Sequence, residues 1–224
     1  MFCAALVAGA LGAAATWPGF DPERIAVTGN HRVTRNEILI EAAIAPHVSI
    51  WLQNTGAMAA RIERIPFVAW AGVQRIPPAS LRIAIEERIP YAQVRSGQSA
   101  AIVDQTLRAL SAAEDDAMAP VFVLQPGVHL TPGTFIRAAS ALELRDVYQA
   151  MREREFVPVE LALDRFGGLV VTLRGGMRLL LGSENDLDQK LTLAKAIEAQ
   201  VASRQPQVTT IDLRAPAAPV VVYR

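Results

Sequence analysis

Apolar positions between residues 25 and 87 follow two repeats, one typical of strands and one typical of helices. Leu81, Ile83 and Ile85 alternate with charged or small residues, which is the period of a strand with one buried face. Ile38 and Ala42 instead share one face of a helix. The pattern predicts a strand, two helices and two strands, at residues 25–28, 34–43, 54–64, 68–75 and 81–87. Such a β-α-α-β-β segment forms a compact module with two helices on one face of a three-stranded sheet.

Residues that start and stop helices support this assignment. The Thr34 hydroxyl can accept the backbone N–H of Glu37, and the Glu37 carboxylate can reach back to the N–H of Thr34, which together form a capping box. Asn54 or Thr55 can cap the second helix, and Pro66 ends it. Both helices are therefore expected to be short.

From Pro90 onward, short β-type segments alternate with two long helical patterns. Ser96-Gly97-Gln98 predicts the turn of a hairpin. The acidic segment 111–119 is expected to be a solvated loop. Strands are predicted at residues 92–94, 100–104, 121–124, 159–164, 168–174, 178–181, 208–214 and 220–223.

The first long helix is expected to start at Thr131 or Thr134 and to run to about Arg154, and the second to cover residues 186–202. The apolar face of the first helix is predicted to consist of Ala138, Ala141, Leu142, Leu144, Val147 and Met151. The predicted fold class is therefore α+β, with a β-α-α-β-β module followed by a mixed, mainly antiparallel β domain with flanking helices. The domain boundaries are expected at 1–19, 20–89 and 90–224.

The N-terminal run from Phe2 to Trp17 contains no charged residue. At about 1.5 Å per residue it spans about 24 Å as a helix, less than the roughly 30 Å hydrocarbon core of a bilayer. No lysine or arginine precedes it, and residues 13–15 could serve as a cleavage site. Three interpretations are open: a cleaved signal segment, a truncated membrane anchor and a buried helix. We expect export by one of the first two, with the body beyond residue 20 outside the cytoplasm.

The balance of charges argues against a nucleic-acid-binding protein. The chain carries 22 lysine and arginine residues against 22 aspartate and glutamate residues, so no net field attracts phosphates. Cys3 is the only cysteine, which excludes an intrachain disulfide and a thiolate metal cluster. We expect no cofactor and no metal.

Recognisable catalytic motifs are missing as well. His31, His47 and His129 lie far apart, and no G-x-S-x-G motif supports a serine nucleophile. Asp164 and Asp212 are expected to form ion pairs with the neighbouring Arg165 and Arg214. An exported hydrolase would need a converging nucleophile and base, so we expect a binding protein and not an enzyme.

Two segments of the first half resemble one known module. IAVTGNHRVTRNEI, from Ile25 to Ile38, resembles the start of a polypeptide-transport-associated (POTRA) module, and RIERIPFVAWAGVQRIPPASLRIAIEERIPYA, from Arg61 to Ala92, resembles its remainder. Such modules also occur in outer-membrane assembly and secretion factors, which are the alternative family.

The second half separates the two families. LALDRFGGLVVTLRGGMRLLLG, from Leu161 to Gly182, then Lys190-Leu191 and the IDLR ending at Arg214, resembles the β domain of the FtsQ/DivIB cell-division proteins. The sequence departs from that family in having a short apolar segment with no basic tail before it, and in the acidic insertion after Leu110. Asp104 is followed by glutamine where the family commonly has glycine.

The resemblance implies a scaffold of the divisome. Such proteins bind FtsB-type (DivIC) and FtsL-type partners through the far end of the β domain, and thereby help to control the septal peptidoglycan synthase complex. It also implies a single-pass protein of the inner (plasma) membrane, located at the septum with most of the chain periplasmic or extracytoplasmic.

The last strand of the chain has no successor, so it is expected at an open sheet edge where a partner strand can pair with it. Proline is tolerated at the start of such a strand, and valine and tyrosine favour strands. Arg214 matches the arginine that ends the family's penultimate strand and can bind a partner carboxylate. An ordinary closing hairpin with a surface arginine is the alternative. The predicted partner-binding residues are Arg214, Pro219, Val220, Val221, Val222 and Tyr223.

Overall fold

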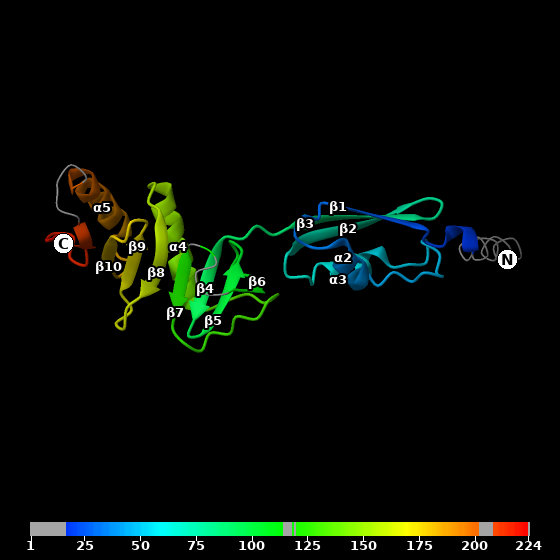
Figure 1. The fold of residues 1–224 in the computed structure, drawn as a ribbon, viewed down its shortest axis with the longest axis horizontal. Helices are drawn as coiled ribbons and strands as arrows, with labels where there is room; N and C mark the ends of the chain where they lie inside the picture. The colour runs from blue at the N-terminus through cyan, green and yellow to red at the C-terminus, as the bar shows by residue number, and fades with distance from the viewer. Residues whose placement is uncertain (1–16, 114–117, 119, 202–207, 224) are drawn as a thin grey trace, which may run out of the picture. The chain divides into compact units, whose positions relative to one another are not determined.

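The computed structural model describes residues 17–113, 118, 120–201 and 208–223 (Figure 1). Within them the chain divides after Ile89 into two compact units, and each is described by itself. Residues 1–16, which form most of the predicted membrane or signal segment, lie outside the described residues, and so do the acids at 114–116. No helix of the described part has both the length and the apolar character needed to cross a bilayer.

The first unit has the predicted β-α-α-β-β order, preceded by one 3₁₀ turn. Its three-stranded sheet has the order β1-β3-β2, in which β1 is parallel to β3 and β2 is antiparallel to it. Both helices lie on one face of this sheet (Figure 1). The elements are η1 Pro18–Phe20, β1 Arg24–Thr28, α2 Arg35–Ala42, α3 Thr55–Ile62, β2 Val68–Ile76 and β3 Ser80–Glu87.

The core of the first unit confirms the sequence periods. Ile83 and Ile85 of β3 are buried beneath Ile38 and Ala42 of α2 and Ile62 of α3, in one cluster. Alternate β3 side chains therefore reach the core, as the period of two requires.

The helix caps are partly as predicted. The Thr34 hydroxyl accepts the backbone N–H of Glu37 at 3.2 Å, which is the first of the two predicted bonds. Asn54, and not Thr55, caps α3, because its Oδ1 accepts the N–H of Ala57 at 2.9 Å. These side chains satisfy N–H groups that a helix start leaves unpaired.

A carboxylate from β3 fixes the turn between β1 and α2. Glu87 accepts the backbone N–H groups of His31, Arg32 and Val33 at 2.7–2.9 Å. Burial opposes ionisation of Glu87, but these three donors outweigh it and lower the pKa of this carboxyl below its usual value.

The second unit contains a mixed nine-stranded sheet within the described residues. Its strand order is β12-β11-β10-β9-β8-β7-β4-β5-β6. The pairs β10/β11, β4/β7 and β7/β8 are parallel and the other five are antiparallel. The strands are β4 Ala92–Ser96, β5 Ser99–Val103, β6 Ala109–Ala112, β7 Val121–Leu124, β8 Pro158–Leu163, β9 Leu169–Leu173, β10 Arg178–Gly182, β11 Val208–Asp212 and β12 Val220–Tyr223.

Two fifteen-residue helices, α4 Ala139–Glu153 and α5 Leu187–Val201, pack into one core with this sheet. Leu144 and Met151 of α4 and Leu191 of α5 are fully buried there against Phe122 and Leu161. Arg154 Nη2 and Asp188 Oδ1 lie 2.8 Å apart and join the end of α4 to α5. Both helices therefore cover the same face of the sheet.

The predicted start of α4 is wrong. The helix starts at Ala139, not at Thr131 or Thr134, because the preceding backbone pairs with another segment: Ala109 N–H donates to Thr134 O, and Ile136 N–H donates to Leu107 O. Residues 133–136 pair in this way with residues 107–109. They lie on the outer side of the chain at the start of β6, a strand that the sequence did not predict.

The predicted apolar face of α4 is also wrong at two positions. Ala138 precedes the helix as its N-cap residue and is only partly buried. Leu142 is 39% exposed, whereas Tyr148, which the prediction omits, is buried. Ala141, Leu144, Val147 and Met151 are buried as predicted.

Candidate functional site

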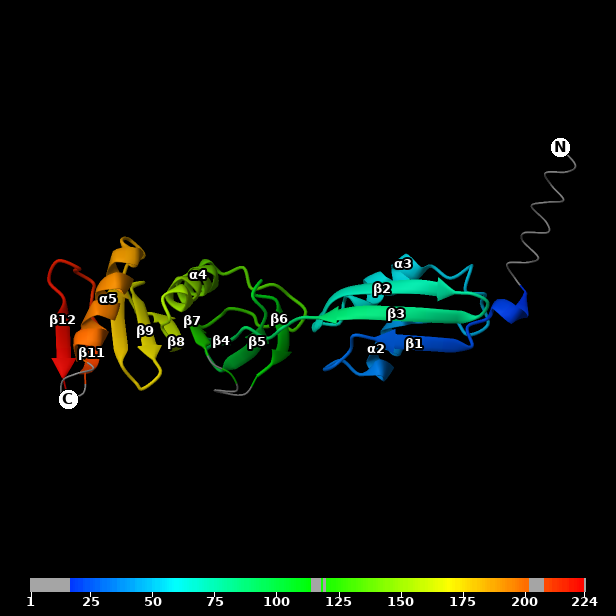
Figure 2. The ribbon, with the colours of Figure 1, turned by 90° about the horizontal axis from the view of Figure 1, so that it is seen from above.

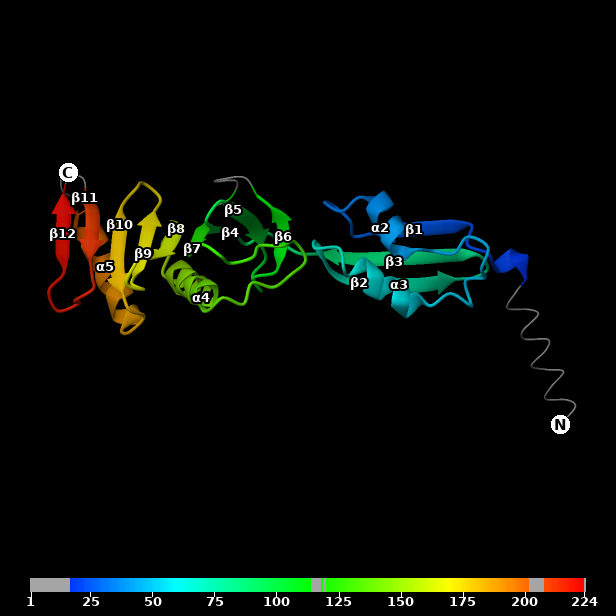
Figure 3. The same ribbon diagram turned by 90° about the horizontal axis from the view of Figure 1, so that it is seen from below.

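The last strand, β12, forms one end of the nine-stranded sheet. It pairs antiparallel with β11, with Asp212 opposite Val220, Ile211 opposite Val221 and Thr210 opposite Val222. No described strand pairs with its outer side, and Figure 3 shows it beyond β11. The predicted edge position is confirmed, while pairing with a partner stays a prediction. Such an edge carries backbone N–H and C=O groups that another strand can pair with.

Side chains on β12 are unusually apolar for an exposed strand. Val220, Val222 and Tyr223 are 56%, 47% and 46% exposed. Because side chains alternate along a strand, Val220 and Val222 share one face and Val221 lies on the other, with Ile211, which is buried in the core. Figure 2 shows α5 against the strands next to β12, with β12 outermost. The edge therefore offers apolar contact on both of its faces.

Hydrogen bonds hold β12 and its connecting loop in place. Leu213 N–H donates to Leu180 O at 2.8 Å, which ties the start of the loop to β10. Ala218 N–H donates to Ala215 O at 3.0 Å and closes a turn just before the exposed Pro219. The Thr209 hydroxyl donates to Val222 O at 3.1 Å. The edge is thus preformed, so a partner would not have to order it.

Arg214 lies just beyond the end of β11 and is held by Asp212. Its Nη2 is 2.6 Å from Asp212 Oδ2, and its Nε is 3.0 Å from Oδ1. The backbone N–H of Arg214 also donates to Oδ1 at 3.0 Å. The hydrogen bond from the Arg214 side chain lowers the pKa of Asp212, and the same contact raises the pKa of Arg214. The predicted ion pair between these two residues is confirmed.

This pairing limits how Arg214 can bind a partner. The contacts to Asp212 use Nε and Nη2. An incoming carboxylate would contact the guanidinium through Nη1, or exchange with Asp212. The Arg214 side chain is 59% exposed, so it is accessible from solvent.

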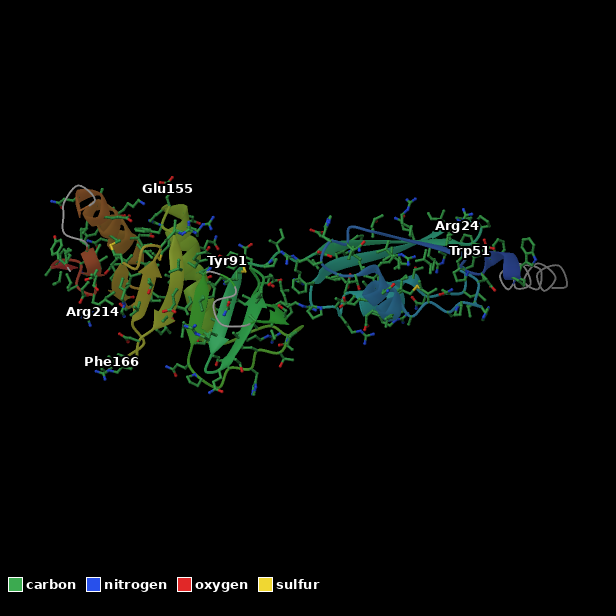
Figure 4. All side chains as sticks on the ribbon, in the orientation of Figure 1. Arg24, Trp51, Tyr91, Glu155, Phe166 and Arg214 are labelled. Carbon is green, nitrogen blue, oxygen red and sulfur yellow. The ribbon has the colours of Figure 1, made fainter. Side chains whose placement is uncertain are left out.

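The β8–β9 turn lies beside the C-terminal end of β10, on the same side of the sheet as Arg214. Phe166 of this turn and Arg214 are labelled in Figure 4. Asp164 accepts the backbone N–H groups of Phe166 and Gly168, both at 2.8 Å. These bonds lower the pKa of Asp164, to which the nearby positive charge of Arg214 also contributes. The predicted interaction with Arg165 is present only as a minor one: the charge of Arg165 also lowers the pKa of Asp164, but the carboxylate is used mainly to fix the turn.

The same turn displays an aromatic side chain that sequence reasoning missed. Phe166 is 82% exposed, with the guanidinium carbon of Arg165 4.7 Å from the centre of its ring. An aromatic residue between an aspartate and two glycines, where turns are usually polar, was the available signal. Phe166 is thus a further exposed apolar side chain, on the turn between β8 and β9.

Gly182 allows Arg214 to approach β10. A Cβ at this position would lie 3.1 Å from Arg214 Cγ, and the backbone has a φ of +68°. Both conditions favour glycine.

Two hydrogen bonds from Lys190 close the loop that precedes α5. Lys190, which is buried, donates from Nζ to Ser183 O at 2.8 Å, and its backbone N–H donates to Asp186 O. Asp186, whose backbone has a φ of +58°, directly precedes α5. In the described part of the chain no three His, Cys, Asp or Glu residues group so as to hold a metal ion.

Two family models match the chain in succession. The model described as POTRA domain, FtsQ-type, matches residues 20–88, and the model described as Cell division protein FtsQ/DivIB, C-terminal, matches residues 92–214. The chain belongs to the FtsQ/DivIB family of cell-division proteins. The edge strand β12 begins just after the segment that matches the C-terminal model.

Individual FtsQ proteins support the assignment. The chain is 27% identical to the cell division protein FtsQ of Bartonella bacilliformis over 199 residues, which are 88% of this chain and 61% of that protein. It is 42% identical to FtsQ of Syntrophotalea carbinolica over 76 residues and 37% identical to FtsQ of Mycolicibacterium smegmatis over 73 residues. These shorter matches cover 34% and 33% of this chain and 27% and 22% of those relatives. The aligned part is thus less than two thirds of each relative's own length.

Proposed function

We propose that this FtsQ/DivIB chain is a non-catalytic scaffold of the divisome that binds another division protein by strand addition at β12. The open edge of β12 carries the proposal. The FtsQ/DivIB match supports the cellular process, and the exposed Val220, Val222 and Tyr223 support the mode of binding.

In this mode of binding the backbone and the side chains contribute differently. A partner strand satisfies the outward N–H and C=O groups of β12, which supplies affinity that depends little on sequence. Contacts with Val220, Val222 and Tyr223 then supply specificity, and Arg214 favours a partner with an acidic residue near the end of its strand. Pro219 withholds one backbone donor at the start of β12 and so limits pairing to the strand itself.

The partners we propose are FtsB-type (DivIC) and FtsL-type proteins. Through them the chain would help to control the septal peptidoglycan synthase complex. The alternative, a POTRA-containing outer-membrane assembly or secretion factor, is disfavoured because residues 92–214 match the FtsQ/DivIB C-terminal model.

We further propose that the chain is a single-pass protein of the inner membrane, with its two units outside the cytoplasm. The uncharged sequence from Phe2 to Trp17 supports this location. In this arrangement residues 1–19 contain the membrane segment, 20–89 form the POTRA domain and 90–224 form the partner-binding β domain.

Binding of the extracytoplasmic part of an FtsB-type protein, measured by calorimetry, tests the function. Val222→Lys places a charge on the exposed β12 edge, a change that natural edge strands use to prevent pairing, and should reduce affinity at least tenfold. Ala112→Lys, an exposed position of β6 at the opposite end of the sheet, is the matched control and should bind like wild type. Equal affinities for both variants and wild type would show that β12 is not the binding edge.

A further inference from the structure

Residues 2–20, 42–60 and 76–81 contain no Asp, Glu, Lys or Arg. Uncharged stretches also occur elsewhere in the chain, the longest at residues 117–136. Within the first three stretches, His47 is the one titratable side chain apart from Cys3.

The described parts of these stretches meet at one end of the first unit. Ile50 N–H donates to Phe20 O at 2.8 Å, which joins the loop between α2 and α3 to η1. Glu23 N–H donates to Ala79 O at 2.8 Å, which joins the segment after η1 to the β2–β3 turn. Figure 4 shows Trp51 beside η1 at this end of the unit.

Large apolar side chains are exposed where the three segments meet. Trp17, Trp51 and Leu52 are 62%, 48% and 56% exposed. We call this surface the apolar tip; it consists of Trp17, Val48, Trp51, Leu52, Pro77 and Pro78, all of which are exposed.

The apolar tip is a built surface, because buried polar groups fix the loop that carries Trp51. The Gln53 side chain is buried and donates to Ala45 O and Val48 O at 3.0 and 2.8 Å, and it accepts the N–H of Ala45 at 3.2 Å. Arg75 donates from Nε to Ile50 O at 2.7 Å and from Nη2 to Gln53 O at 2.6 Å.

These contacts also lower the cost of taking the loop out of water. Carbonyl groups that lose water without gaining another partner cost free energy in an apolar environment. Gln53 and Arg75 supply donors from within the protein to the carbonyls of residues 45, 48, 50 and 53. The loop can therefore leave water with these groups satisfied.

We propose that the apolar tip inserts into the interfacial region of a lipid bilayer, so that the first unit rests on the membrane surface. The inference rests on the membrane location proposed above. Trp17 follows directly on the uncharged sequence from Phe2, so the tip surrounds the point where that sequence joins the folded unit. Tryptophan favours the boundary between headgroups and acyl chains. The six residues of the tip are uncharged, so their insertion does not require an anionic headgroup, and the exposed Glu23 and Arg24 follow η1 at the same end of the unit (Figure 4).

Trp70 provides an internal control, because it is equally exposed but lies elsewhere. It is 52% exposed near the start of β2, whereas the tip lies beyond the end of that strand. Six residues of strand separate Trp70 from Ile76, which corresponds to about 20 Å. Interfacial segments penetrate about 5–10 Å, so Trp70 should stay in water while Trp51 does not.

The test uses the full chain in phosphatidylcholine vesicles whose acyl chains carry bromine, which quenches nearby tryptophan fluorescence. One variant keeps only Trp51 (Trp17→Phe with Trp70→Phe), and the other keeps only Trp70 (Trp17→Phe with Trp51→Phe). We expect a blue-shifted and strongly quenched Trp51 and an unquenched Trp70, with no change at about 1 M salt, where exposed charges are screened beyond about 3 Å.

Adding Leu52→Asp to the Trp51-only protein should reduce the quenching, while the thermal unfolding midpoint stays the same because Leu52 is exposed. Quenching of Trp51 no greater than that of Trp70 would overturn the proposal, and would indicate that the tip meets protein or water instead. If the chain does not float with the vesicles at all, the membrane location fails as well. Partner binding at β12 is measured separately and is unaffected by either result.

Discussion

Arg214 and Asp212 form a two-point ion pair at the end of β11, with Nη2 2.6 Å from Oδ2 and Nε 3.0 Å from Oδ1. The pair fixes the guanidinium at the end of β11, where the Arg214 side chain lies close to Gly182 of β10. Arg214→Glu should reverse the local charge, repel Asp212 and weaken binding of an acidic partner at least tenfold. Calorimetry with the FtsB-type partner measures this. Arg214→Lys keeps the charge but loses the fork geometry, so it should fall between wild type and the glutamate variant.

Folding should tolerate the Arg214 substitutions. The side chain is exposed, and exposed ion pairs contribute little to stability. A urea midpoint close to that of wild type is therefore expected for both variants, and a large fall would mean that Arg214 is structural. Unchanged partner affinity would remove Arg214 from the binding site.

Tyr223→Ala tests the aromatic at the end of β12. Tyrosine is among the residues that contribute most when buried at interfaces, so truncation should cost at least about 1.4 kcal/mol of binding, or tenfold in Kd. The free protein already exposes 46% of this residue, so its unfolding should change little. Phe166→Ala at the neighbouring turn should have a smaller effect on affinity, and a reversed order would move the centre of the interface to the β8–β9 turn.

Gly182→Ala separates backbone strain from contact with Arg214. The φ of +68° should cost about 1 kcal/mol of stability for a residue with a Cβ. The new methyl group would also lie 3.1 Å from Arg214 Cγ and displace that side chain. Gly167→Ala, with a φ of +81° and no atom within 4 Å of its Cβ, is the control. Both should lose similar stability in urea, and partner affinity should fall for Gly182→Ala alone; an equal fall in both would contradict a role for the Arg214 contact.

Two leucines of α4 form a matched pair for stability. Leu144 is fully buried, whereas Leu142 is 39% exposed. Leu144→Ala should cost about 2–5 kcal/mol of unfolding free energy because it leaves a cavity. Leu142→Ala should cost less than about 1 kcal/mol. Equal losses in urea denaturation would contradict the observed orientation of the helix.

Acid should remove the contribution of Glu87. Its pKa in the folded protein lies below the ordinary glutamate value of 4.5, so the folded state binds fewer protons than the unfolded state in the acid range. The stabilisation by Glu87 is therefore complete above about pH 4.5, the pKa of an ordinary glutamate, and it is lost as the pH falls through the lower pKa of the folded state. Wild type should exceed Glu87→Gln in stability at pH 7, and the difference should disappear in strong acid.

Urea denaturation across the pH range measures this difference. Glu86→Gln, at the exposed neighbouring position on the other face of β3, should show no comparable pH-dependent difference. A constant gap between wild type and Glu87→Gln at every pH would mean that the three backbone hydrogen bonds do not depend on the charge.

The period of the apolar residues was enough to predict most helices and strands, because the burial of one face of each element determines that period. The period of two at Leu81, Ile83 and Ile85 identified β3, and the turn signals around Gly97 identified the β4–β5 hairpin. Chain order alone predicted that the last strand would lie at an edge. These features depend on local pattern or on topology.

The wrong predictions concern segments whose conformation depends on contacts with distant parts of the chain. Thr134 could cap a helix, but the backbone of residues 133–136 is bound to residues 107–109, a contact between distant segments that no local pattern contains. The exposure of Phe166 and of Trp51 was missed for the same reason. An apolar residue in the sequence predicts burial by default, and only the assembled fold shows which ones remain in solvent.

The two ends of the nine-stranded sheet differ, and the difference limits growth. At β6 the outer side is partly occupied by residues 133–136, whereas at β12 the described chain leaves it open. A sheet with two free ends can stack copies head to tail without limit, as an unclosed heterologous contact does. Pairing of β12 with β6 of another copy is therefore hindered at the start of β6, where residues 133–136 already bind Ala109.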